Sequence, residues 1–170
     1  KMNIKGTKSE KNVAAAFAGE SQARNKYTYY MQVATAEGLT ALADFYEQMA
    51  KNEMKHAKVW FKLLNDGLGS VEEGLIDAAK GESDEWTSMY PQFAKDAREE
   101  GLEELAQLFE KVAGVERDHE RRFLEELMKY KSGSASAAPV LATRQPAKVC
   151  MYCGYIHLKA DGEPPYVCPL

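Results

Sequence analysis

Two copies of the pattern Glu-x-x-His are the residues of this chain best suited to chemistry. The first copy is EMKH, Glu53–His56, and the second is ERDH, Glu116–His119. Residues three apart share one face of a helix, so each pair can present a carboxylate and an imidazole to the same metal ion. One isolated pair of this kind is usually a surface ion pair. Two copies favour a metal site if both face the interior.

Both pairs occupy positions where a helix would normally bury an apolar residue. Apolar residues recur every three or four positions around them, and Met49 and Trp60 lie on this stripe on either side of the first pair. Val112 and Phe123 flank the second pair in the same way. The pattern therefore predicts that both pairs point into a core, where a charged group needs a partner.

Three further glutamates lie on the apolar faces of predicted helices. Glu20 sits among small apolar residues (AAAFAGESQA), and Glu85 follows Glu82 by about one turn. Two divalent or trivalent cations would compensate the resulting five carboxylates better than any other partner in the sequence. A carboxylate-rich set with one imidazole per metal suits iron or manganese better than zinc or copper.

An internal repeat relates the two pairs at an offset of 63 residues. Residues 37–56 align without gaps on residues 100–119, with nine identities in 20 positions. The same offset relates Tyr27 to Tyr90, and each lies about two turns from a candidate ligand. We therefore expect two related helical hairpins packed face to face, with these two hydroxyls as candidates for supporting the ligands.

Four helical segments must position these residues. Strong helix formers dominate the first 130 residues, and glycine-containing breaks divide them into segments at 8–37, 39–65, 70–99 and 102–130. Ser70 and Glu73 form a predicted capping box at the start of the third segment. Pro91 lies inside that segment, so we expect a kink near it. The predicted fold class is an all-α four-helix bundle.

Composition excludes several classes of protein. Of the 170 residues, 45% are hydrophobic and 28% charged, and the formal net charge is −4. These values are typical of a globular protein and give no reason to expect nucleic acid or a membrane as a partner. Residues 1–12 lack the apolar run of a signal peptide, and no stretch is long enough to span a bilayer. We expect a cytoplasmic protein.

The three cysteines all lie near the C-terminus, after a change in composition. Residues 132–147 are rich in Ser, Ala, Gly and Pro and read as a flexible linker. Cys150 and Cys153 form one Cys-x-x-Cys pair, and Cys168 begins a second in Cys-Pro-Leu. Paired Cys-x-x-Cys sequences hold one iron or zinc ion through four thiolates. We expect residues 148–170 to be such a domain, with the fourth ligand just past Leu170.

Taken together, AFAGESQARNKYTYY, the EMKH and ERDH segments, GESDEWTSMYPQFAKDAREEG and the C-terminal CMYCGYIH…CP resemble the rubrerythrin family. The resemblance covers nearly the whole chain. It implies a ferritin-like di-iron four-helix bundle over residues 1–131, followed after the linker by a rubredoxin-like domain that is incomplete here. The implied cofactors are two iron ions in the bundle, and one iron in the four-cysteine site of a complete chain.

The same resemblance implies roles for the ligands. Glu53 and Glu116 would bridge the two irons, while Glu20 and Glu82 would be terminal ligands. His119 would hold one iron, and the other iron would exchange Glu85 for His56 when the pair is reduced. The implied activity is a peroxide reductase that converts hydrogen peroxide to water. Electrons would come from NADH through a separate reductase and enter at the Cys-ligated iron.

Other readings remain open at this point. A ferritin-like ferroxidase or iron-handling protein would use the same carboxylates, and a zinc-ribbon interaction module would use the cysteines. The topology is also open, because only about four residues separate the second and third predicted helices. Either residues 70–80 form the crossover that such bundles need, or two chains exchange helix pairs in a homodimer.

Overall fold

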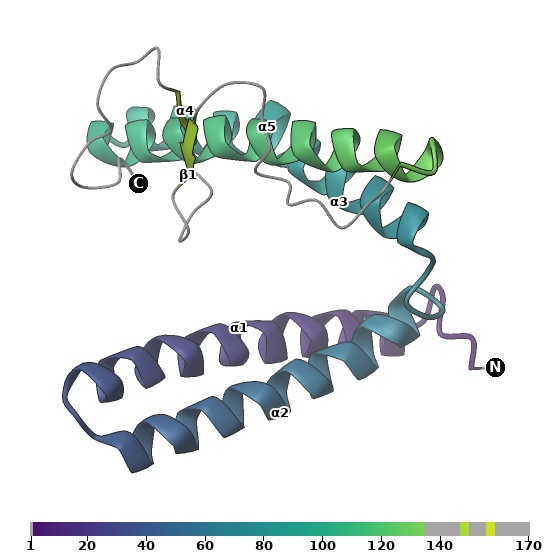
Figure 1. Cartoon of the computed structure of the whole chain (residues 1–170), viewed down its shortest axis with the longest axis vertical. Coiled ribbons are helices and arrows are strands. Elements are labelled where there is room, and N and C mark those ends of the chain that lie inside the picture. The colour runs from purple at the N-terminus through teal and green to yellow at the C-terminus, as the bar shows by residue number, and fades with distance from the viewer. Residues whose placement is uncertain (1, 135–146, 150–155, 159–170) are drawn as a thin grey trace. The chain divides into compact units, whose positions relative to one another are not determined.

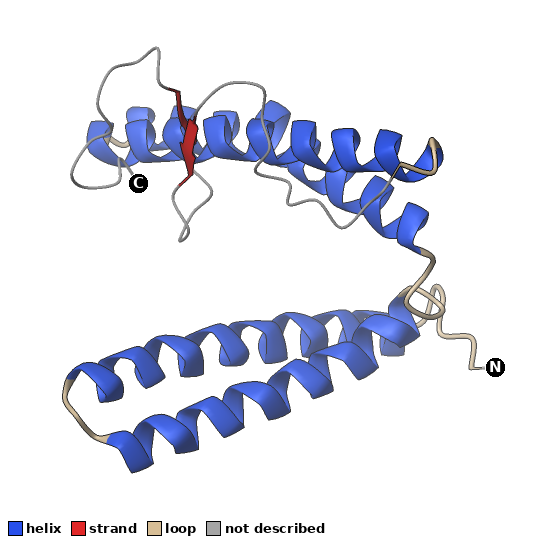
Figure 2. Ribbon diagram, viewed as in Figure 1, coloured by secondary structure: helices blue, strands red, loops and turns tan. Residues whose placement is uncertain are grey.

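The computed structural model describes residues 2–134, 147–149 and 156–158 (Figure 1). The chain divides into two compact units, Lys1–Gly69 and Ser70–Leu170. Each unit contains one pair of long helical segments, as Figure 2 shows. The predicted all-α fold class with four helical segments is therefore confirmed, and the predicted segment boundaries agree with the observed ones to within one residue.

The first unit is a hairpin of α1 (Lys8–Ala36) and α2 (Thr40–Leu64). Gly38 ends the turn between them with a φ of 74°, a left-handed conformation that suits glycine. Three buried alanines recur every seven residues along α2, at Ala43, Ala50 and Ala57. Their small side chains allow the two helices to pack closely, which brings side chains of α1 next to side chains of α2.

The second unit pairs one long helical segment with α5 (Glu103–Lys131). The long segment consists of α3 (Val71–Asp84), the π-helix η1 (Glu85–Met89) and α4 (Tyr90–Glu99). Its core is Ala94, Ala97 and Ala106, with Phe109 packed against them. Gly101 forms the turn with a φ of 77°, at the position that the repeat relates to Gly38.

The capping box at the start of α3 is present. The Glu73 backbone N–H donates to Ser70 Oγ at 3.2 Å, and the Ser70 N–H donates to Glu73 Oε2 at 2.6 Å. At the same end of the unit, Lys131 Nζ pairs with Glu72 Oε1 at 2.9 Å. Residues 71–80 therefore form the first turns of a helix that packs on α5, with Ser70 as its N-cap.

The irregularity expected near Pro91 takes the form of the π-helix. Pro91 lies in the first turn of α4, where a proline needs no backbone donor, and the wider turn from Glu85 to Met89 precedes it. Single turns of π-helix inside longer helices are frequent at functional sites. Here the π-helix begins at one of the candidate ligands, Glu85.

Near the C-terminus the structure describes two short strands, β1 (Ala147–Val149) and β2 (Ile156–Leu158). They pair antiparallel, with Lys148 opposite His157. Cys150, Cys153 and Cys168 lie outside the described residues, as does most of the predicted linker, so the predicted cysteine site stays a prediction. Within the described part of the chain, no helix combines the length and apolar character needed to cross a membrane.

Candidate metal centre

The first cluster of candidate ligands joins α1 to α2. Glu53 and His56 lie one turn apart on α2, and His56 Nδ1 is 2.8 Å from Glu53 Oε2. Glu20 reaches the same point from α1, with its Oε2 3.8 Å from His56 Nδ1. All three ligand atoms lie within 4.8 Å of one another, close enough to bind a single metal ion.

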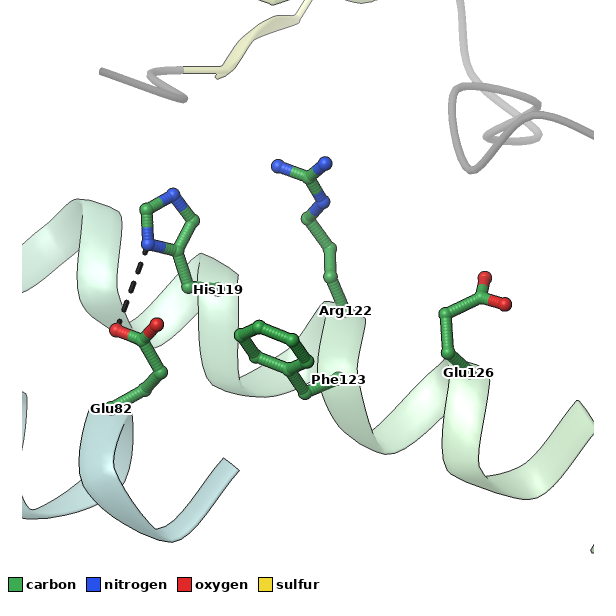
Figure 3. Close-up of a pocket in the computed structure, with 5 residues that line it drawn as sticks. All are labelled: Glu82, His119, Arg122, Phe123 and Glu126. Carbon is green, nitrogen blue, oxygen red and sulfur yellow. Dashed lines mark ion pairs between the residues drawn. The ribbon is translucent and has the colours of Figure 1, made fainter. Parts of the chain in front are cut away.

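The second cluster joins α3 to α5 in the same way. His119 Nδ1 is 2.7 Å from Glu116 Oε2 and 3.6 Å from Glu82 Oε2. Figure 3 shows the His119 ring turned toward the Glu82 carboxylate across the space between the two helices. A cavity of about 340 Å³ opens beside this pair, with Arg122, Phe123 and Glu126 as its other lining residues.

The two clusters have nearly the same geometry, as the repeat predicts. The distance within each Glu-x-x-His pair is 2.8 Å in the first cluster and 2.7 Å in the second, and the distance to the third carboxylate is 3.8 Å and 3.6 Å. Six of the seven predicted di-iron ligands are thus collected into two sets of three. Each set contains two carboxylates and one imidazole.

The clusters differ in exposure and in their surroundings. The His56 side chain is 55% exposed, whereas that of His119 is 26% exposed. Glu85, the seventh predicted ligand, begins the π-helix beside the second cluster but is not part of its set of three. Its pKa is raised by burial first and by the nearby Glu82 carboxylate second. The second cluster therefore has an additional acid and a better covered histidine.

The carboxylates in both clusters are close enough to perturb one another. Hydrogen bonding with Glu53 raises the pKa of Glu20, and the same interaction lowers the pKa of Glu53. Burial raises the pKa of Glu82, although the nearby His119 opposes this shift. Acids gathered in this way repel one another unless a proton or a cation lies between them.

The two predicted tyrosines have different neighbours. Burial raises the pKa of Tyr90, and the carboxylates of Glu85 and Glu116 add to this effect, so its hydroxyl lies near the second cluster. Tyr27 packs on the ring of Tyr46, with 6.4 Å between ring centroids. No polar contact of Tyr27 with a ligand is found among the described residues. Its supporting role stays a prediction.

Two tryptophans near the clusters were not predicted to have a role. Trp86, in the π-helix next to Glu85, donates its indole N–H to Glu120 at 2.5 Å, and Glu120 is adjacent to His119 in α5. The buried Trp60 N–H has no hydrogen-bond acceptor within the described part of the structure. It is nevertheless close enough to Glu20 to lower the pKa of that carboxyl slightly against the dominant upward effect of Glu53. In the sequence, only the adjacency of Trp86 to Glu85 could have indicated that a tryptophan lies near a cluster.

The donor set is compatible with a pair of iron ions. Among the described residues, only the two histidines form ion pairs with Glu20, Glu53, Glu82 and Glu116, and no lysine or arginine does so. Both imidazoles turn a nitrogen toward the carboxylates of their own cluster. Oxygen-rich ligation with one nitrogen per ion suits iron. The arrangement can therefore bind two cations and buffer changes in their charge.

Comparison with known proteins identifies relatives that match nearly the whole chain. The rubrerythrin family model matches residues 11–127 and, in a second overlapping match, residues 73–149. The chain is 40% identical to the rubrerythrin of Porphyromonas gingivalis, over 98% of this chain and 86% of that protein. It is 39% identical to the rubrerythrin of Nitratidesulfovibrio vulgaris, over 98% of this chain and 91% of that protein.

Proposed function

The chain belongs to the rubrerythrin family, a family of iron-binding oxidoreductases, and from this premise we propose that it reduces hydrogen peroxide to water. The observation that carries the proposal is the pair of repeat-related clusters, each with two carboxylates and one imidazole and with no lysine or arginine partner among the described residues. Such ligand sets suit two metal ions that change oxidation state during a reaction.

The family resemblance suggests how the clustered residues would hold two iron ions. Glu53 and Glu116 would be shared by the two ions, and Glu20 and Glu82 would each bind one of them. His119 would hold one ion, while Glu85 and His56 would alternate on the other. The exposure of His56 supports this alternation, because its imidazole is less confined by packing than that of His119. The position of Glu85 at the first residue of a π-helix supports it as well.

The reaction needs two electrons and two protons for each peroxide. The O–O bond breaks, and each oxygen leaves as one molecule of water. A bound iron pair would supply the two electrons, one from each ion. The carboxylates of the clusters offset the change in charge. Burial and the carboxylates of Glu85 and Glu116 raise the pKa of Tyr90, whose hydroxyl can donate a hydrogen bond beside the second cluster.

Electrons return to the site one at a time in this proposal. Cys150, Cys153 and Cys168 would hold an iron ion that accepts these electrons from a separate reductase supplied by NADH. Thiolate ligation of this kind is suited to the reducing cytoplasm.

The test compares two oxidants. The iron-loaded protein is reduced without oxygen and then mixed with hydrogen peroxide or with dioxygen, and its oxidation is followed by absorbance. We expect oxidation by peroxide to be faster, with no mineral formed. Accumulation of more than three iron atoms per chain would instead identify an iron-storage ferroxidase, and equal rates with both oxidants would contradict the peroxide assignment.

A further inference from the structure

The π-helix η1 accommodates one more residue than the matching stretch of the first hairpin. In the first hairpin, Glu20 and Tyr27 are seven residues apart in the sequence. Their counterparts Glu82 and Tyr90 are eight residues apart. The Tyr90 backbone N–H donates to the carbonyl of Glu85, five residues back, as a π-helical turn requires. The repeat alone therefore does not determine where the side chains of this turn lie.

The hydroxyl groups in and after this turn bond only within their own helical segment. The Thr87 hydroxyl donates to the Ser83 carbonyl at 2.6 Å, and the Ser88 hydroxyl donates to the Asp84 carbonyl at 2.8 Å. Pro91 has no backbone N–H, so it cannot donate to a carbonyl of the preceding turn as another residue would. A contact with a neighbouring helix is therefore needed to hold the turn in a defined position.

Trp86 supplies such a contact. Its indole N–H donates to Glu120 Oε2 on α5 at 2.5 Å, and both side chains are partly buried. No other side-chain hydrogen bond links η1 to α5 among the described residues. The donor directly follows Glu85 in the sequence, and the acceptor directly follows His119. The bond therefore joins the wide turn to α5 beside two candidate ligands.

The first hairpin has neither partner of this bond. The repeat relates Glu120 to Ala57, a buried alanine of α2 that is 8% exposed. Helix α1, the counterpart of the segment that carries Trp86, contains no tryptophan. A carboxylate in place of a buried alanine is unfavourable unless it gains a partner. The presence of donor and acceptor in the same hairpin indicates that the bond serves a feature of that hairpin, the additional acid Glu85.

The position of Glu85 depends on the backbone of the turn that carries it. Its carboxylate forms no hydrogen bond or ion pair among the described residues. Burial raises the pKa of Glu85, the Glu82 carboxylate raises it further and His119 opposes both, so the carboxylate lies near the second cluster. Since its own side chain is not tied, Glu85 keeps this place only as long as the turn stays on α5.

We propose that the hydrogen bond between Trp86 and Glu120 is a positioning contact, which fixes the π-helix on α5 and so keeps the Glu85 carboxylate beside the second cluster. The inference rests on the proposed iron pair, for which Glu85 is a ligand in the oxidised state. It adds two residues that bind no metal themselves and act through Glu85.

The first test measures the reduction potential of the iron pair in the full-length protein. Glu85→Gln removes a negative ligand of the oxidised pair and should raise the potential. We expect Trp86→Phe to shift the potential in the same direction, because phenylalanine keeps an aromatic ring but cannot donate the hydrogen bond. In the Glu85→Gln background, Trp86→Phe should cause no further shift. Equal shifts in both backgrounds, or no shift in the single variant, would overturn the proposal.

Two variants of Glu120 separate the hydrogen bond from the packing. Glu120→Gln keeps an oxygen that can accept from Trp86, so we expect a potential close to that of the wild type. Glu120→Ala removes the acceptor and should match Trp86→Phe. Glu125→Ala is the matched control, since Glu125 pairs with Arg121 within α5 at 2.6 Å, and it should leave the potential unchanged. Equal shifts in Glu120→Gln and Glu120→Ala would exclude the hydrogen bond as the cause.

Hydrogen exchange in the metal-free protein tests the contact without iron. We expect the backbone amides of Glu85–Met89 to exchange about tenfold faster in Trp86→Phe, while those of α1 and α2 keep their wild-type rates. Unchanged exchange in this turn would overturn the proposal, and circular dichroism checks that each variant keeps its helices. Failure of the wild-type protein to bind an iron pair would instead refute the proposed function, and the exchange rates would still decide whether Trp86 holds the turn.

Discussion

Each Glu-x-x-His pair works as a unit because the helix brings its carboxylate and imidazole to one point. The 2.7–2.8 Å contact inside each pair exists before any metal binds, so the ligands are held in place in advance. The third carboxylate comes from a neighbouring helix and is about 1 Å farther away in each cluster. Hydrogen bonding with Glu53 raises the pKa of Glu20, and burial raises that of Glu82. A cation bound among the ligand atoms would oppose both shifts, because it favours the ionised carboxylates.

Glu53→Ala tests whether a predicted bridging residue is needed. We expect iron affinity to fall by more than about tenfold, because the substitution removes a ligand outright and not merely a group that supports one. Titration with ferrous iron under anaerobic conditions measures this. Glu47→Ala is the matched control, since Glu47 lies on the same helix but pairs with Lys51 on the surface. Equal iron binding by both variants would contradict the assignment of Glu53.

Tyr90→Phe tests the hydroxyl beside the second cluster. We expect the rate of oxidation by peroxide to fall by about tenfold, because a hydrogen-bond donor near the reacting oxygen is lost while the ring packing on Phe93 and Phe109 is kept. Iron content should stay constant. Tyr29→Phe is the control, since Tyr29 is an exposed tyrosine. Stopped-flow mixing with peroxide gives the rates, and an unchanged rate in Tyr90→Phe would remove this residue from the mechanism.

At the scale of the elements, the π-helix is the feature that makes the two hairpins differ. The repeat predicts two equal units, yet only the second has a wide turn after its terminal ligand, with Glu85 at its start. Trp86 in the same turn is bonded to Glu120 on α5, which ties the wide turn to the helix that carries His119. The additional acid Glu85 and the Trp86–Glu120 hydrogen bond beside it therefore belong to the second hairpin alone among the described residues.

Ser70→Ala tests the capping box that starts α3. We expect the free energy of unfolding to fall by about 1 kcal/mol, because the backbone N–H of Glu73 loses its acceptor. Thermal unfolding followed by circular dichroism measures the change. Ser9→Ala, at an exposed position within α1, should change stability by less than about 0.5 kcal/mol. Comparable effects of the two substitutions would mean that the cap contributes nothing.

The same capping box predicts a pH dependence. The backbone hydrogen bond from Ser70 lowers the pKa of Glu73, so the folded state binds this proton more weakly than the unfolded state. The contribution of Glu73 is therefore present above its ordinary pKa and is lost as the pH falls through the lower, folded value. Glu73→Ala should reduce the Tm at neutral pH, and this difference should shrink below about pH 3.5. A difference that is independent of pH would contradict this account.

At the scale of the whole molecule, neither hairpin contains a full set of ligands. Each provides one cluster of three ligand residues, and the proposed pair of iron ions would draw on both clusters.

A chain that ends at Lys131 tests the division of labour between the bundle and the cysteine-containing region. We expect it to bind the iron pair and to react once with peroxide at the full-length rate, since all seven ligands are present. Continuous turnover with NADH and a reductase should fall by at least about tenfold, because the thiolates that accept electrons are missing. Single-turnover and steady-state assays separate the two effects. Full turnover by the shortened chain would exclude an essential role for the cysteines.

Much of the fold and the candidate site could be predicted from the sequence because the responsible forces are local. Helical segments follow from residue propensities and from glycine at the turns, and the segment boundaries agree with the structure to within one residue. The pairs Glu53–His56 and Glu116–His119 share a helix face by the geometry of the helix alone. The capping box at Ser70 depends on residues three apart and was predictable for the same reason.

Tertiary structure decided what depends on contacts between distant residues. It placed Glu20 and Glu82 beside the pairs, left His56 more exposed than His119, and joined Trp86 to Glu120. It also turned the expected kink at Pro91 into a π-helix and showed that residues 71–80 are helical. The sequence by itself thus determined which side chains are candidate ligands, because spacing on a helix is local. Packing between helices decides how the ligands are grouped and how far they are covered, and the spacing of residues along one helix does not determine that packing.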